Sequence, residues 1–204
     1  DQQPLDLPPT SYETVGLWWA AGPGIEESLR RSEEHFLGAL HAGEHAAISL
    51  FPLLAICDRG DIGGISLPFH PQVGCGAVFV YDGHPGGVGI AARGFADLPE
   101  LLARVLSLLD GCGCEEGCPS CIQSPKCGNG NRPLDKAGAA RVLRILLGQE
   151  EAAPTPRRRE PVAEIGGREE REEVDEVDGV DLVDPEKDPA PERVPFLLST
   201  PSTS

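Results

Sequence analysis

Five of the seven cysteines in this 204-residue chain stand within sixteen consecutive residues. They are Cys112, Cys114, Cys118, Cys121 and Cys127. The segment that carries them is rich in Gly and Pro and has no hydrophobic run that could pack it into a fixed shape. Such a loop needs a crosslink, and closely spaced thiolates supply one most directly by binding a metal ion.

The spacing favours a structural zinc site. Zinc takes four ligands in a tetrahedron, usually Cys or His, and four thiolates leave no position open for water. Cys118 and Cys121 form a Cys-x-x-Cys pair, and Cys114 and Cys127 lie on either side of it. We therefore predict one zinc ion bound by Cys114, Cys118, Cys121 and Cys127. Cys112 is left out because it stands very close to Cys114.

Other chemistry for these thiols stays open. An iron–sulfur cluster also takes four Cys ligands, and exported proteins pair their thiols in disulfides. The first residues, 1–6, carry neither a basic start nor an apolar stretch of a secretory signal, and an odd number of Cys argues against a closed disulfide framework. Zinc is favoured, and the isolated Cys57 and Cys75 are expected to be ordinary buried residues.

Charge divides the chain in two. The net charge of −16 splits into −7 over residues 1–148 (10 basic, 17 acidic) and −9 over 149–204 (7 basic, 16 acidic). Residues 149–204 are rich in Glu, Asp, Pro and Arg and have too few apolar residues to offset chain entropy, so they are predicted to form a disordered acidic tail. No stretch approaches the ~18 apolar residues of a membrane span.

The remaining sequence predicts an α+β, helix-rich fold with a few short strands. Strands are expected at 13–20, 65–67 and 76–81. Helical periodicity covers 25–56, with interruptions at Gly43 and Pro52, and further helices are expected from about residue 88, at 98–109 and at 135–147. Asp135 is the predicted N-cap of the last helix, and the zinc loop lies between the last two helices.

Three other segments could carry chemistry. His41, Glu44 and His45 match H-x-x-E-H, a zinc-peptidase signature, although no third metal ligand stands out. Asp58 and Asp61 flank Arg59 in a glycine-rich loop, which favours a salt-bridged clasp over catalysis, with metal binding left open. Residues 82–89 form a glycine turn before a helix, which suits either a tight turn or a phosphate site.

Taken together, these blocks resemble a known family over about residues 12–148. The carrying residues are His41-x-x-Glu44-His45, Cys57-Asp58-Arg59-x-Asp61, Tyr81-Asp82-x-x-x-Gly86-Gly87, and Cys114-x-x-Gly117-Cys118-Pro119-x-Cys121 continuing to Cys127-Gly128-Asn129-x-Asn131 and Leu134-Asp135-Lys136. This pattern resembles the MrfA-type zinc-binding domain of superfamily-2 DNA helicases of the MrfA and Hrq families.

The resemblance implies an accessory domain of an ATP-dependent helicase that moves 3′ to 5′ on DNA, with a role in repair. Its zinc ligands would be the four cysteines predicted above. Because no secretory signal opens the sequence, we expect a cytoplasmic location, associated with the nucleoid. The chain has no P-loop and no DExH box, so ATP and magnesium would belong to motor lobes on the same or a separate polypeptide. The implied organisation is a linker and strand at 1–24, the zinc domain at 25–148 and the tail at 149–204, in a C-terminal fragment that lacks the motor.

The implied partners are the motor lobes and DNA, with no membrane. Phosphate contacts need Lys and Arg, and five of the ten basic residues before the tail gather into one possible basic face: Lys126, Arg132, Lys136, Arg141 and Arg144. Two alternatives remain: a stand-alone H-x-x-E-H metallohydrolase, and an interaction module that acts through the acidic tail.

Overall fold

A computed structural model describes residues 11–155, which form an α+β fold, as the sequence predicts. The elements in chain order are β1 (Gly16–Ala21), α1 (Pro23–Arg31), α2 (Phe36–Leu50), the 3-10 turn η1 (Phe51–Leu53), β2 (Ile62–His70), β3 (Cys75–Asp82), α3 (Ile90–Ala96), α4 (Leu98–Gly111) and α5 (Lys136–Leu146). The cysteine-rich loop connects α4 to α5.

The sheet is antiparallel, with β3 between β1 and β2. Because side chains alternate along a strand, Leu17 and Trp19 of β1 share the buried face with their partners Val80 and Val78. The opposite face carries a row formed by Trp18, Phe79 and Ile65, which are aligned across the three strands. Trp18 and Ile65 keep 38% and 49% of their surface exposed, so this face is only partly covered.

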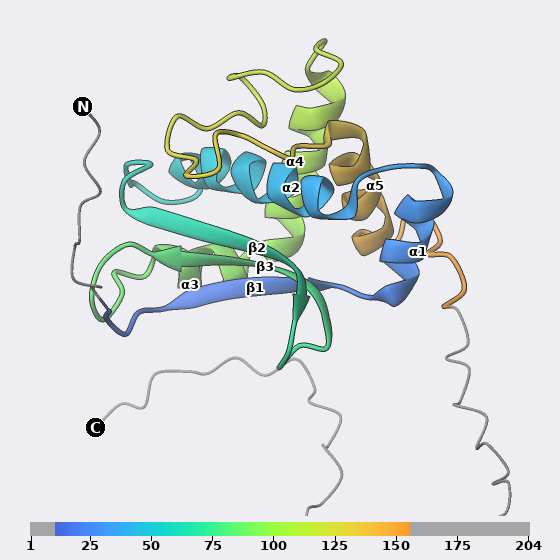
Figure 1. Ribbon diagram of the computed structural model, residues 1–204. Helices are drawn as coiled ribbons and strands as arrows, with labels where there is room; N and C mark the ends of the chain where they lie inside the picture. The colour runs from blue at the N-terminus through green and yellow to red at the C-terminus, as the bar shows by residue number, and fades with distance from the viewer. Residues whose placement is uncertain (1–10, 156–204) are drawn as a thin grey trace, which may run out of the picture. The chain divides into compact units, whose positions relative to one another are not determined.

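Helix α2 is the centre of the fold. It packs against β2 and β3 on one side and against α4 and α5 on the other, as Figure 1 shows. Strand β2 approaches α2 closely at Gly64, where an added Cβ would lie 2.8 Å from Ile48 Cδ1 and 2.9 Å from Glu44 Cγ. Ten consecutive residues of α2, Gly38–Ala47, are buried, so the polar side chains among them must find partners inside the protein.

Two expected boundaries differ from those observed. The helical region breaks at residues 32–35 and not at Gly43, which lies inside α2. An interior Gly weakens an exposed helix by about 1 kcal/mol relative to Ala, but tertiary packing on both sides of α2 outweighs that preference. Strand β2 is also longer than the expected 65–67, since it pairs with β3 from Ile62 to His70.

The ends of α2 and α5 share one carboxylate. Asp135 caps α5, as predicted from the sequence: one of its carboxylate oxygens accepts a hydrogen bond from Gly138 N at 2.7 Å. Its other oxygen accepts from His35 N at 2.7 Å, just before α2 begins. One residue therefore satisfies donors at two helix N-termini and fixes α5 beside α2.

The first strand, β1, and the residues just after Gly148 both contact the rest of the fold. Strand β1, inside the expected 1–24 segment, pairs with β3. After Gly148 the chain contacts both α5 and α1: Glu150 pairs with Arg141 of α5 at 2.5 Å, and Ala153 N donates to Ser28 Oγ of α1 at 2.8 Å. Residues 156–204, most of the expected acidic tail, lie outside the described residues, and the boundaries at 24/25 and 148/149 stay predictions.

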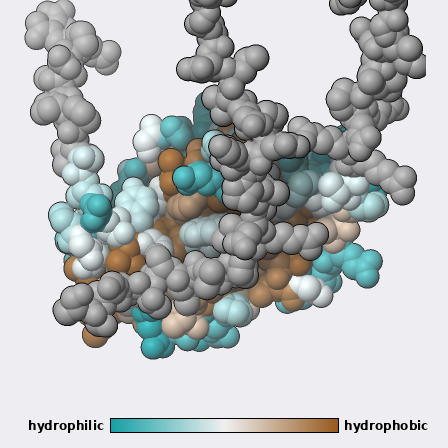
Figure 2. All heavy atoms as spheres, turned by 90° about the horizontal axis from the view of Figure 1, so that it is seen from below, coloured by the Kyte–Doolittle hydropathy of each residue, from teal (hydrophilic) through white to brown (hydrophobic). Residues whose placement is uncertain are grey.

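Within residues 11–155, no helix combines the length and the apolar character that crossing a bilayer requires. Several large hydrophobic side chains are nevertheless exposed. They are Tyr12, Trp18, Leu53, Ile56, Ile65, Phe69 and Val88. Figure 2 shows hydrophobic residues on the face seen from below in Figure 1.

Candidate metal centre

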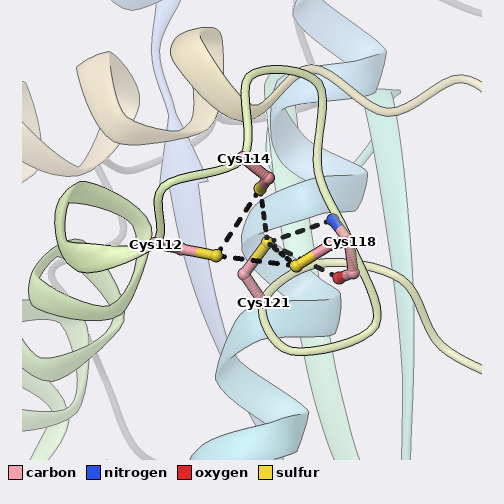
Figure 3. Close-up of side chains that lie close together, drawn as sticks. All are labelled: Cys112, Cys114, Cys118 and Cys121. Carbon is pink, nitrogen blue, oxygen red and sulfur yellow. Dashed lines mark hydrogen bonds between the residues drawn. The ribbon is translucent and has the colours of Figure 1, made fainter.

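Four thiols of the loop converge on one point. The Sγ atoms of Cys112 and Cys114, of Cys112 and Cys118, and of Cys114 and Cys121 each lie 3.5 Å apart, and those of Cys118 and Cys121 lie 3.7 Å apart. Figure 3 shows the four side chains pointing toward one another. We call this set the four-thiol cluster.

The donor set fits zinc. Sulfur ligands of a tetrahedral zinc ion, with Zn–S bonds of about 2.3 Å, lie about 3.8 Å apart, close to the separations observed. All seven thiols of the chain are free, so none of the contacts is a disulfide. Four thiolates fill the coordination shell, and a site of this kind crosslinks the chain without binding substrate.

The loop is shaped locally for this convergence. Cys118 O accepts hydrogen bonds from the backbone N–H groups of Cys121 and Ile122, which closes a turn and directs both side chains of the Cys-x-x-Cys pair inward. Gly117 precedes the turn with φ of 109°, and an added Cβ would lie 2.3 Å from Ile122 Cδ1. Only Gly fits that position.

A lysine of the next helix holds the other half of the cluster. Lys136 Nζ donates hydrogen bonds to the carbonyl oxygens of Cys112 and Cys114, both at 2.6 Å. The ammonium group therefore fixes the backbone of two cluster residues and places a positive charge beside the thiols. No local pattern predicts this contact, because Lys136 lies 22 residues or more from the groups it binds.

The thiols affect one another's ionisation. Burial alone would raise the pKa of Cys114, but hydrogen bonds from the other three thiols and from Lys136 lower it to about 7. A backbone hydrogen bond from Ser120 and the thiol of Cys112 lower the pKa of Cys118. Burial raises the pKa of Cys121 to about 12. A bound cation would favour the thiolate form of every member, because metal ligands must be deprotonated.

The structure groups the thiols differently from the predicted ligand set. Cys114, Cys118 and Cys121 come together as expected, but the fourth member is Cys112 and not Cys127. Cys112 directly follows α4, so the helix end carries its thiol to the cluster, and one intervening residue is enough for Cys112 and Cys114 both to reach it. The identity of the four ligands stays a proposal.

Cys127 lies instead beside the H-x-x-E-H segment. Its Sγ is 3.4 Å from His41 Nε2, and the metal-binding atoms of His41, His45 and Cys127 all lie within 4.8 Å of one another. We call this set the His-His-Cys cluster. The two imidazoles stand one turn apart on α2, with ring centroids separated by 4.3 Å, so both lie on the same face of the helix.

The His-His-Cys cluster borders a pocket of about 350 Å³. Glu44, Arg59 and Lys126 line the same pocket. Burial raises the pKa of Glu44 to about 7, although a hydrogen bond with Ser66 lowers it. Burial also lowers the pKa of His45, which favours its neutral form.

The glycine turn is occupied by the protein's own carboxylate. Fully buried Asp82 accepts hydrogen bonds from the N–H groups of Val88, Gly89 and Ala91 at 2.6–2.7 Å. The amides that could have bound a phosphate at the start of α3 therefore already hold an anion, which favours the tight-turn interpretation. Asp61 accepts from Asp58 N and contacts His84 Nε2 at 3.0 Å, so in the described residues its partner is His84 and not Arg59, as the expected salt-bridged clasp required.

Three of the five residues of the expected basic face are engaged within the protein. Arg141 pairs with Glu34 at 2.7 Å and with Glu150, and Arg144 pairs with Asp110 at 2.6 Å. Lys136 holds the four-thiol cluster. These contacts reduce the positive charge that the face offers to a phosphate backbone.

Residues 43–122 match the family model of the MrfA Zn-binding domain. An uncharacterized protein of Methanocaldococcus jannaschii is 40% identical over 111 residues, which cover 53% of this chain and 99% of that protein. The uncharacterized ATP-dependent helicase YprA of Bacillus subtilis is 29% identical over 120 residues, or 58% of this chain. The ATP-dependent helicase HRQ1 of Saccharomyces cerevisiae is 24% identical over 163 residues, or 71% of this chain.

The chain thus spans nearly all of the archaeal relative but only 16% of YprA and 14% of HRQ1. Among solved structures, the DUF1998 helicase MrfA bound to DNA gives a TM-score of 0.49 at 26% identity. That match covers 70% of this chain and 18% of the helicase.

Proposed function

This chain belongs to the MrfA Zn-binding domain family, and we propose that it is the zinc-binding accessory domain of an ATP-dependent 3′-to-5′ DNA helicase that acts in DNA repair. The four-thiol cluster, which lies inside the segment that matches the family, is the observation that carries the proposal. ATP hydrolysis and magnesium binding belong to the motor lobes, since this sequence has neither a P-loop nor a DExH box.

The proposed ligands of a single structural zinc ion in the four-thiol cluster are Cys112, Cys114, Cys118 and Cys121. A metal ion here would crosslink the C-terminal end of α4 to the turn that precedes α5, and Lys136 would complete the link from α5. The role of the metal is therefore mechanical: it holds the last two helices in a fixed relation. Structural zinc sites of this kind supply folding free energy directly.

The open face of the sheet is the proposed contact with the motor lobes. Ile65 and its neighbours in the row are apolar and partly exposed, and the helicase relatives are about six or seven times longer than the segment they share with this chain. Residues 1–148 carry a net charge of −7, two of the clustered cations are already ion-paired, and a third, Lys136, is held by backbone carbonyls. The domain would therefore leave most phosphate contacts to the motor and would shape the DNA path beside it.

The test is reconstitution with the motor lobes of the source organism. The chain alone is expected to hydrolyse no ATP. Added to the motor lobes, it should increase ATP-dependent unwinding of a duplex with a 3′ single-stranded overhang. Ile65→Asp should weaken that effect with zinc content unchanged, whereas Leu53→Asp, at an even more exposed position outside the sheet, should not. Unwinding that does not respond to the chain would contradict the proposal.

Two other functions can be separated from this one. A metallohydrolase centred on His41, Glu44 and His45 would cleave peptides, lose that activity in Glu44→Gln and keep it in Cys118→Ser. An interaction module that acts through residues 150–204 would lose its partner when that segment is deleted, while unwinding with the motor lobes stayed unchanged.

A further inference from the structure

A second group of metal-binding side chains lies apart from the four-thiol cluster. His41 and His45 come from the middle of α2, and Cys127 comes from a loop that is 86 residues away from His41 in sequence. Their ligand atoms gather within 4.8 Å, and the group shares no residue with the four-thiol cluster. Tertiary packing alone brings these three residues together.

Hydrogen bonds determine which ring nitrogen of each imidazole carries a proton. His41 Nδ1 lies 2.8 Å from Pro133 O, and His45 Nδ1 lies 2.7 Å from Ile122 O. A carbonyl oxygen can only accept, so each Nδ1 carries the proton and donates. In the neutral imidazole the Nε2 atom then presents its lone pair. Histidines that bind metals in proteins are held in this way, with the second ring nitrogen donating to a carbonyl or carboxylate.

The thiol is oriented toward the same point. Asn131 N donates a hydrogen bond to Cys127 Sγ at 3.2 Å, which holds the sulfur in place. The side chain of Asn131 also bonds to both backbone groups of Ser124, at 2.7 and 3.0 Å, and so closes the loop that carries Cys127. The 3.4 Å separation between Cys127 Sγ and His41 Nε2 matches two ligands of one tetrahedral ion, for which Zn–S of about 2.3 Å and Zn–N of about 2.0 Å give roughly 3.5 Å.

We propose that His41, His45 and Cys127 bind a second divalent metal ion of the zinc class. Two imidazoles and one thiolate are a borderline-soft donor set that suits zinc, and cobalt can replace it as a probe. Three protein ligands leave one coordination position, and the pocket of about 350 Å³ that all three residues line is where water or a small anion reaches it. The two sites therefore differ: the four-thiol site is closed, and this site is open.

The first experiment is metal stoichiometry of the full chain after reconstitution with zinc. The wild type is expected to hold two equivalents, and Cys127→Ser and His41→Gln are each expected to hold one. Cys75→Ser is the matched control, because Cys75 is also partly buried but belongs to neither cluster, and it should hold two. Far-ultraviolet circular dichroism checks that each variant is folded.

Cobalt absorption then assigns the lost ion. Five thiolates contribute sulfur-to-cobalt charge transfer in the wild type, four from the first cluster and Cys127 from the second. His41→Gln should lose the bands of the cobalt with mixed nitrogen and sulfur ligands and keep those of the all-sulfur cobalt. Cys112→Ser should do the reverse, and it keeps the proposal testable if Cys127→Ser fails to fold.

Two results would overturn the proposal. One equivalent in the wild type that persists in Cys127→Ser would mean that the His-His-Cys cluster is only a hydrogen-bonded group. One equivalent that is lost in Cys127→Ser and kept in Cys112→Ser would assign Cys127 to the first site, as the sequence spacing suggested. Neither result depends on unwinding, so the accessory-domain function stands or fails separately.

Discussion

The four-thiol cluster and the His-His-Cys cluster differ most in how the chain assembles them. The first draws all its members from ten consecutive residues, 112–121, and a local turn with a glycine sets their geometry. The second needs α2 to be packed under the loop at 122–133, with carbonyls of that loop holding both imidazoles. A local site can form as soon as its loop does, whereas a nonlocal site exists only in the complete fold.

The largest effect is expected from Cys118→Ser. Without this thiol the four-thiol cluster loses a ligand, and structural zinc contributes about 10–16 kcal/mol of apparent binding free energy in zinc-finger peptides. The loop at 112–134 should unfold, which hydrogen exchange would detect as loss of protection. Because Ile122 O holds His45, the second cluster should weaken too. Unchanged protection in this loop would show that the metal does not hold it.

Cys112→Ser separates the two clusters more cleanly. Loss of a partner that only orients a ligand lowers metal affinity about 10–100-fold, so loss of a ligand should lower it by more than about 100-fold at the first site. The second site should keep its metal, since Cys112 is not part of it. Competition with a chelator of known zinc affinity measures the zinc affinity of both sites. Retained affinity at the first site, together with loss in Cys127→Ser, would restore the predicted ligand set.

Lys136→Met tests the link between α5 and the first cluster. Removal of the ammonium group leaves the carbonyls of Cys112 and Cys114 without their donor, and we expect about a 10–100-fold drop in zinc affinity at the four-thiol cluster alone. The control is Lys126→Met, since Lys126 lines the other pocket. Equal losses in the two variants would indicate a general effect of charge.

Asn131→Ala is expected to have the smallest effect, on the stability of the loop that carries Cys127. It removes two hydrogen bonds to Ser124 and places Ala at a φ of 61°, so unfolding free energy should fall by about 1–2 kcal/mol. Asn131→Gly measures the contribution of the hydrogen bonds alone, because Gly adopts a positive φ without strain. Asn129→Ala, in the same loop, serves as the control. Chemical denaturation measures all three, and equal losses in Asn129→Ala and Asn131→Ala would contradict the assigned role.

Local patterns predicted the elements well and their ends less well. The Leu repeat of α4, the Asp135 cap and the β3 run needed only neighbouring residues, and all three are observed. The break near Gly43 was predicted from helix propensity and is wrong, because β2, α4 and α5 surround α2 and packing outweighs the preference of one glycine. The glycine turn at residues 82–89 could be either a tight turn or a phosphate site for a related reason. The anion that the amides at the start of α3 bind is the side chain of Asp82, whose position depends on where β3 ends.

The sequence by itself determined that a thiol-rich loop joins the last two helices, that His41, Glu44 and His45 form an H-x-x-E-H motif in a helical region, and that these blocks resemble one family. Short separations constrain geometry through covalent bonds and helical periodicity, so such conclusions need no partner. Only the tertiary structure decided that Cys112 joins the loop thiols while Cys127 faces α2. That choice depends on how α2, α4 and α5 pack, and residues 86 positions apart meet only where the buried surfaces of those helices place them.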